Sequence, residues 1–262
     1  MASTPIHAPG APFAQSQLDP SWGALANIAL PALELISFGS AVRQSLELVS
    51  NGTHKARFGE QLGKTQATLR ASAVPVLVEE SRSETSVVAP RDLKRRQRRW
   101  LGQLALELYF AQIFQSDTAI IDLSPSRLGV STDGEAVWQP RPLYVRWDSS
   151  FLQGIRDVYA GFFLDDDARF ARGVAALDLG SGGAALTRHF GDNSQRSVRF
   201  GLDELESTLH ELTVARGPAG GPLHPNFIAF GLYAASLHQL LESLDLAFDV
   251  RAAFNRIRRA SK

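Results

Sequence analysis

Apolar residues recur at the three- and four-residue spacing of helices over most of the chain. In the first third this spacing covers 25–48, where Pro31 and Gly39 interrupt it and predict two helical pieces. It resumes over 55–71, after the turn dipeptide Asn51-Gly52. Further along, the same spacing predicts helices over 92–114, 150–163, 168–177, 203–216, 225–244 and 250–259. The sequence therefore predicts a mainly helical protein.

Short β-branched runs predict a smaller strand content. Residues 73–79 form one such run, and we expect 85–89 to be its antiparallel partner across a polar turn. Asp133-Gly134 is typical of a hairpin turn, here between strands at 128–130 and 135–138. Two further strands are expected at 118–121 and 143–147.

Together these segments predict an α+β fold that is mainly α. Residues 1–24 contain four prolines and little apolar pattern, so we expect a flexible tail there. We divide the remainder at residue 91 into a first part, 25–91, with helices and a strand pair, and a mostly helical second part, 92–262.

Composition narrows the class of protein. Of 262 residues, 44% are hydrophobic and 21% charged, a balance typical of globular domains with a substantial core. Lys plus Arg (27) equals Asp plus Glu (27), so no global field favours nucleic acid or anionic lipid. The absence of cysteine excludes disulfides and thiolate zinc sites. With neither a long apolar stretch nor a secretory leader pattern, the expected location is cytoplasmic.

A glycine-rich stretch is the first candidate for chemistry. Gly180, Gly182 and Gly183 follow a short apolar run and resemble the first motif of S-adenosylmethionine-dependent methyltransferases, with Asp203 placed as the ribose-binding acid. Only 79 residues (262 − 183) follow Gly183, too few for a complete doubly wound sheet. We therefore favour a flexible connection between helices and keep methyltransferase-like activity as an alternative.

Two charge clusters have structural as well as functional interpretations. The basic run Arg91–Arg99 could contact phosphate or an anionic membrane surface, although such runs are more often solvated helix starts. The acidic triplet Asp165–Asp167 is more typical of a helix cap than of a cation site. None of the six histidines shows metal-ligand spacing, so no metal is expected.

The most informative constellation lies in the middle of the chain. Gln112-Ile113-Phe114 ends a predicted helix, Asp122 lies in the following loop, and Asp133-Gly134 marks the hairpin beyond it. A helix, an acid-bearing loop and a hairpin are arranged in this order around the catalytic loop of protein kinases. There an Asp orients the attacking hydroxyl, and an Asn just downstream holds Mg²⁺.

These residues resemble the UbiB/AarF family of atypical, protein-kinase-like proteins. That family's catalytic segment reads approximately H-A-D-P-H-P-G-N, a hydrophobic run and D-G, after a Q-I-F-like helix end. The similarity spans roughly 34–259 and also includes Val74-Pro75-Val76 with Glu80, Leu223-His224-Pro225, and Leu244-Asp245 with Phe248-Asp249. The resemblance implies a kinase-like C-lobe with a reduced N-terminal lobe.

Departures from the family pattern decide the expected function. Carried over by position, Asp122 is the catalytic Asp, Arg127 replaces the metal-binding Asn, and Asp148 is the sole counterpart of the D-F-G Asp. The family's K-x-G-Q motif and alanine-rich nucleotide loop are not found. Without a complete metal site, phosphoryl transfer lacks its electrostatic stabilisation. We hypothesise that Arg127 pairs with Asp122 and closes the former active site.

The sequence thus predicts a catalytically inactive, pseudokinase-type module that binds, scaffolds or regulates a protein partner. The resemblance implies an intact kinase-like or lipid-pathway enzyme as that partner, in lipid or quinone metabolism. No cofactor and no nucleic acid are expected, and membrane contact is at most peripheral through Arg91–Arg99. Cofactors are expected under the alternatives alone. A residual ATPase would use ATP with Mg²⁺ through Asp122 and Asp148, and a methyltransferase-like protein would use S-adenosylmethionine.

Overall fold

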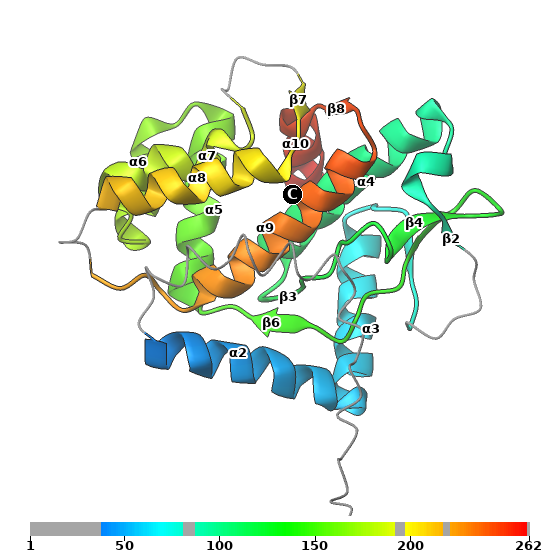
Figure 1. Ribbon diagram of the computed structural model, residues 1–262, viewed down its shortest axis with the longest axis horizontal. Coiled ribbons are helices and arrows are strands. Elements are labelled where there is room, and N and C mark those ends of the chain that lie inside the picture. The colour runs from blue at the N-terminus through cyan, green and yellow to red at the C-terminus, as the bar shows by residue number, and fades with distance from the viewer. Residues whose placement is uncertain (1–37, 81–86, 192–196, 217–220, 261–262) are drawn as a thin grey trace, which may run out of the picture.

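A computed structural model describes residues 38–80, 87–191, 197–216 and 221–260 (Figure 1). The predicted tail, and the expected helical piece before residue 38, lie outside these residues. The described chain is mainly helical with three small sheets, which confirms the α+β, mainly α prediction. None of its helices combines the length and apolar character needed to cross a membrane.

The helices follow the predicted apolar periodicity closely. They are α2 (Phe38–Thr53), α3 (Lys55–Ala71), α4 (Arg95–Gln115), α5 (Ser149–Leu164), α6 (Asp167–Ala176), α7 (Gly183–Arg188), α8 (Leu202–Arg216), α9 (Asn226–Ser243) and α10 (Val250–Ala260), with 3-10 turns η1 (Pro90–Asp92) and η2 (Gly180–Gly182). The short helix α7 was not predicted. Asn51-Gly52 does not form a turn, because α2 continues to Thr53.

The start of α4 also differs from the prediction. The predicted helix began at residue 92, whereas Asp92 lies in η1 and the capping position falls on Lys94, which has an extended backbone. The side chain of Gln97 reaches back and accepts a hydrogen bond from the Lys94 N–H at 3.1 Å. Gln97 therefore satisfies a backbone donor at the helix entry, as the third helical residue does in a capping box.

The strands form a four-stranded sheet and two two-stranded ladders. Their bounds are β1 (Val76–Val78), β2 (Val87–Val88), β3 (Thr118–Ile120), β4 (Leu128–Ser131), β5 (Ala136–Trp138), β6 (Tyr144–Arg146), β7 (Val198–Arg199) and β8 (Ala247–Phe248). The sheet order is β1-β5-β4-β2, while β3 pairs with β6 and β7 with β8. The predicted hairpin of β4 and β5 is confirmed, with Gly134 in the turn at a φ of 87°.

The predicted pairing of β1 with β2 is wrong. The hairpin of β4 and β5 lies between them, so that β1 pairs in parallel with β5 and β2 pairs antiparallel with β4. Strands from the part before residue 91 therefore complete a sheet whose centre comes from the part after it. The strand order depends on contacts between residues far apart in the sequence, which bury β4 and β5 at the centre of the sheet. The pattern of residues within one strand does not reveal this order.

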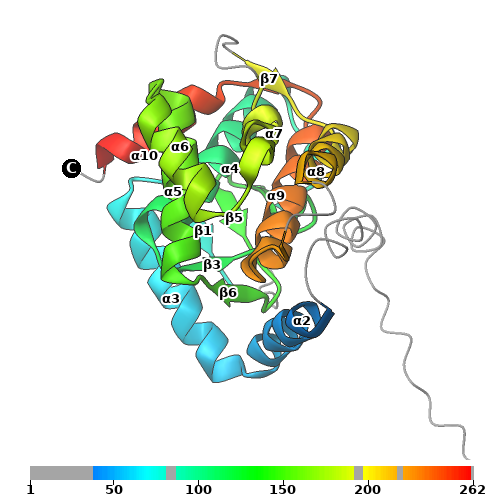
Figure 2. The same cartoon turned by 90° about the vertical axis from the view of Figure 1, so that its left-hand side faces the viewer.

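Helix α4 forms the axis of the fold (Figures 1 and 2). All its residues from Leu101 to Ile113 except Gln103 are buried, so the helix has no solvent-facing stripe over this length. Helices α3, α5, α9 and α10 pack against it. A helix buried on every side needs neighbours all round, and these helices supply them. The buried carboxylate of Glu107 on α4 pairs with Arg256 on α10 at 3.0 Å, and burial raises the pKa of this carboxyl group.

Strand β1 has an outer edge that no strand of the described residues covers. The side chain of Gln66 on α3 lies along it, donating to the Val76 carbonyl at 3.2 Å and accepting from the Val78 N–H at 2.8 Å. One amide side chain thus satisfies an outward acceptor and an outward donor of the strand.

The acidic triplet connects α5 to α6, as predicted. Asp166 is the N-cap of α6, where its carboxylate accepts the Arg169 N–H at 2.9 Å, while Asp165 ends α5 in a left-handed conformation. The two helices then pack very closely through glycine. A Cβ atom at Gly161 would lie 2.4 Å from the backbone nitrogen of Phe170.

Replacing this glycine tests the close packing. Gly161→Ala places a methyl group against backbone that cannot rotate away, so we expect it to lower the free energy of unfolding by about 1–3 kcal/mol. Gly63→Ala on α3 is the matched control, because a Cβ there meets nothing within 4 Å. That change should stabilise the protein by about 1 kcal/mol through helix propensity. Urea denaturation measures both, and equal effects of the two changes would contradict the packing.

Candidate functional site

The acid-bearing loop begins where α4 holds the end of β3. Gln112 of α4 accepts a hydrogen bond from the Ile120 N–H at 2.8 Å and donates to the Tyr233 hydroxyl of α9 at 2.6 Å. All three groups are buried, so the amide replaces the water that these polar atoms would otherwise bind. The Gln of the Q-I-F motif thus fixes the point where the chain leaves β3.

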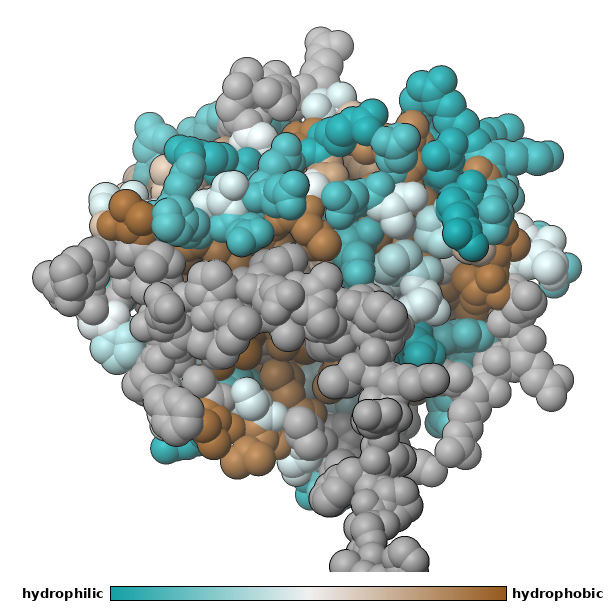
Figure 3. Space-filling model, in the orientation of Figure 1, coloured by the Kyte–Doolittle hydropathy of each residue, from teal (hydrophilic) through white to brown (hydrophobic). Residues whose placement is uncertain are grey.

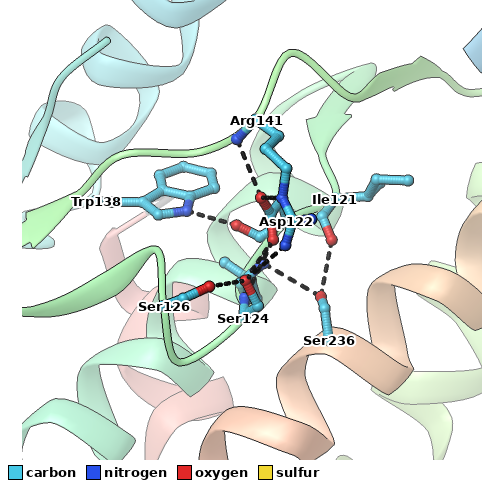
Figure 4. A network of polar contacts seen from close by, with 8 residues as sticks. Ile121, Asp122, Ser124, Ser126, Trp138, Arg141 and Ser236 are labelled. Carbon is cyan, nitrogen blue, oxygen red and sulfur yellow. Dashed lines mark hydrogen bonds and ion pairs between the residues drawn. The ribbon is translucent and has the colours of Figure 1, made fainter. Parts of the chain in front are cut away.

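Two further contacts hold the backbone of the loop itself (Figure 4). Ser236 of α9 donates to the Ile121 carbonyl at 2.7 Å and accepts from the Leu123 N–H at 3.2 Å. The indole N–H of Trp138, at the end of β5, donates to the Asp122 carbonyl at 2.7 Å. Helix α9 and the sheet therefore hold the loop from two sides.

The side chain of Asp122 lies at the centre of this network (Figure 4). Its Oδ1 accepts the Ser124 hydroxyl at 2.7 Å. Its Oδ2 accepts two bonds from Arg141, one from the backbone N–H at 3.0 Å and one from Nε at 2.9 Å. The Asp122 side chain is 1% exposed and that of Arg141 is 19% exposed. Both carboxylate oxygens are therefore bound within the protein, and a cation balances the buried charge.

The cation beside Asp122 is not the one expected from the sequence. We predicted Arg127, whereas the ion pair within the described residues is formed by Arg141. Arg127 lies on the loop with its backbone N–H bonded to the Ser124 carbonyl and its own carbonyl bonded to the Gln139 N–H.

The hairpin register explains the difference. Leu128 is opposite Trp138, so the chain that leaves β5 runs back toward the loop and brings Arg141 there three residues later. Extending the predicted hairpin pairing would have revealed this return. Alignment with the motif of the resembling family pointed to Arg127 and did not reveal that Arg141 is the partner of Asp122.

Asp148 is far from Asp122 within the fold. In the antiparallel ladder Ile120 is opposite Tyr144 and Thr118 is opposite Arg146, so Asp122 and Asp148 leave the ladder at opposite ends. Asp148 is the N-cap of α5, and its carboxylate accepts the N–H groups of Ser150 and Phe151. Hydrogen bonding by the Ser150 hydroxyl is the main cause that lowers the pKa of Asp148. The carboxylate thus stabilises a helix start.

The glycine-rich stretch lies between helices, and α6 rather than a strand precedes it. A Cβ at Gly182 would lie 2.7 Å from Leu212 of α8, and one at Gly183 would lie 2.3 Å from Val174 of α6. These glycines permit close helix packing, whereas Gly180, with φ of 54°, forms the turn. Asp203 is exposed in the first turn of α8, roughly 13 Å along that helix from Leu212. The structure therefore does not bring Asp203 to the glycines.

Two histidines that the sequence analysis left unassigned lie together. His189 follows α7 and His238 is on α9, with ring centroids 5.3 Å apart, and both are buried. Burial lowers the pKa of His238 to about 4 and lowers that of His189 well below its ordinary value. Both histidines are therefore neutral near pH 7. No group of three or more His, Cys, Asp or Glu is placed to hold a metal ion within the described chain.

Removing the charge of Asp122 tests its role in holding the loop. Asp122→Asn leaves Arg141 without its anion, so we expect the free energy of unfolding to fall by about 3–5 kcal/mol. Asp117→Asn is the matched control, because its ion pair with Arg146 is exposed on both sides and should contribute less than about 1 kcal/mol. Chemical denaturation of both variants measures the difference, and a loss below 1 kcal/mol for Asp122→Asn would contradict the assignment.

The histidine pair predicts a dependence of stability on pH. Below about pH 6.5 the unfolded chain binds protons that the folded chain excludes, so stability should fall as the pH drops toward about 4. His238 alone accounts for about 3 kcal/mol of this loss. His238→Gln should flatten the unfolding profile over this window, whereas His210→Gln, at an exposed position on α8, should leave it unchanged. Equal profiles for the wild type and His238→Gln would contradict the prediction.

Comparisons of the sequence with models of protein families and with curated proteins return no match. A functional proposal therefore depends on the geometry around Asp122.

Proposed function

We propose that this protein is a catalytically inactive kinase-like module that acts by binding a protein partner. The observation that carries the proposal is the buried ion pair of Asp122 and Arg141. In kinase-like phosphoryl transfer the loop Asp accepts a proton from the substrate hydroxyl, and metal ions neutralise the charge that develops on the phosphoryl group. Phosphoryl transfer therefore requires an accessible carboxylate and bound metal ions beside it.

The first requirement is a carboxylate within hydrogen-bond reach of a substrate. Asp122 is 1% exposed, and both of its oxygens accept hydrogen bonds from Ser124 and Arg141. A substrate hydroxyl could reach Asp122 after displacement of the guanidinium, which would leave a buried charge uncompensated. This cost opposes a catalytic role for Asp122.

The second requirement is a pair of metal ligands near that carboxylate. Arg127 occupies the position at which the resemblance expects an Asn, and Asp148 caps α5 at the other end of the β3–β6 ladder. Next to Asp122 the chain supplies the guanidinium of Arg141, a fixed positive charge. In our proposal this guanidinium neutralises Asp122, as a metal ion would in an active kinase.

If the loop around Asp122 cannot catalyse phosphoryl transfer, the protein acts through binding at its surface. We therefore favour a binding, scaffolding or regulatory role toward a partner enzyme. A kinase-like or lipid-pathway enzyme as that partner, and a place in lipid or quinone metabolism, belong to the same proposal through the family resemblance.

Ligand-induced thermal stabilisation tests this function. A nucleotide at 100 times its dissociation constant adds about 2.7 kcal/mol of stability, so binding would be evident as a higher melting temperature. We expect no shift with ATP and Mg²⁺, none with S-adenosylmethionine, and no release of phosphate from ATP. An Mg²⁺-dependent shift with ATP, or turnover of ATP by the wild type, would overturn the proposal.

A further inference from the structure

The start of α4 has an unusual concentration of exposed positive charge. Lys94, Arg95, Arg96 and Arg99 are all exposed, and the first turn of the helix contains no acidic residue. None of these four side chains forms an ion pair with the described part of the chain. We call these four residues the α4 basic patch.

The position of the α4 basic patch is unfavourable for the helix itself. The first turn of a helix has a positive dipole end, where cations destabilise and anions stabilise. In α10 two of the cations, Arg258 and Arg259, lie in the favourable last turn, and one, Arg251, lies in the first turn. The arrangement on α4 therefore does not serve helix stability, whereas an external anion would be attracted by the cations and by the dipole together.

The geometry of the α4 basic patch indicates the shape of its partner. Arg95 and Arg96 are consecutive helical residues, and since helical positions advance by about 100°, their side chains leave the helix axis in different directions. The neighbouring Arg98 points back to the protein and donates to the Leu244 carbonyl at 3.3 Å. In Figures 1 and 3 this end of α4 projects at the upper right and is covered by hydrophilic side chains. A projecting helix end fits a flat anionic surface better than a narrow ligand.

We propose that the α4 basic patch docks this protein on an anionic lipid bilayer. This inference is independent of the proposed function, since it uses no residue of the Asp122 loop. Each Lys or Arg near such a surface strengthens binding by about fivefold. The whole chain is neutral, with 27 basic and 27 acidic residues, so its net charge adds no attraction, and the concentration of cations at this end would orient the molecule on the membrane.

Vesicle co-sedimentation of the full chain tests the proposal. We expect binding to vesicles of phosphatidylcholine mixed with phosphatidylserine, little binding to phosphatidylcholine alone, and weakening as salt screens the charges. The triple variant Arg95→Gln/Arg96→Gln/Arg99→Gln should bind about a hundredfold more weakly. It should also melt at a slightly higher temperature, because two of the cations removed, Arg95 and Arg96, lie in the first turn at the positive end of the helix dipole. Loss of binding caused by misfolding would instead lower the melting temperature.

The control variant removes the same charge elsewhere. Arg43, Arg57 and Arg259 are exposed on α2, α3 and α10, and their simultaneous replacement by Gln should leave vesicle binding unchanged. An equal loss in this control would overturn the proposal, as would no binding of the wild type at low salt. Tighter binding to polyuridylate or polyglutamate than to the mixed vesicles at the same salt would also overturn it in favour of a different anionic partner.

Discussion

A carboxylate almost without access to water needs a fixed positive charge, and here that need brings three separate segments together. Asp122 follows β3, Arg141 comes from the segment after β5, and Ser236 of α9 holds the backbone on either side of Asp122. Neither partner of the ion pair is stable in this environment without the other. The pairing therefore ties the segment between β5 and β6 to the loop that follows β3.

The buried length of α4 supplies the rigid support for this arrangement. Its Tyr109 packs on Tyr159 of α5 and on Tyr233 of α9, with the hydroxyls of Tyr109 and Tyr159 2.9 Å apart. One turn later, Gln112 binds β3 and Tyr233. The same helix face thus combines aromatic packing with the polar contacts that a buried strand end requires. The core and the candidate site consequently form one structural unit.

Local sequence patterns were sufficient to predict the helices and strands. They were insufficient to predict which strands pair and which residues form the ion pair. The helix at 55–71 and the hairpin at Asp133-Gly134 were predicted correctly, because periodicity and turn chemistry are properties of neighbouring residues. The pairing of β1 with β5 and the choice of Arg141 over Arg127 depend on residues far apart in the chain. Periodicity within one segment does not predict such contacts, although extension of the predicted hairpin pairing would have brought Arg141 back to the loop.

The side chain of Gln66 has a consequence for association between molecules. An exposed strand edge is a template on which another chain can add a strand, and edge strands are a common origin of aggregation. Along β1 the amide of Gln66 already occupies the Val76 carbonyl and the Val78 N–H, so an incoming strand would first have to displace it. Leu77, although 42% exposed between them, is thereby protected from recruiting an intermolecular β-sheet.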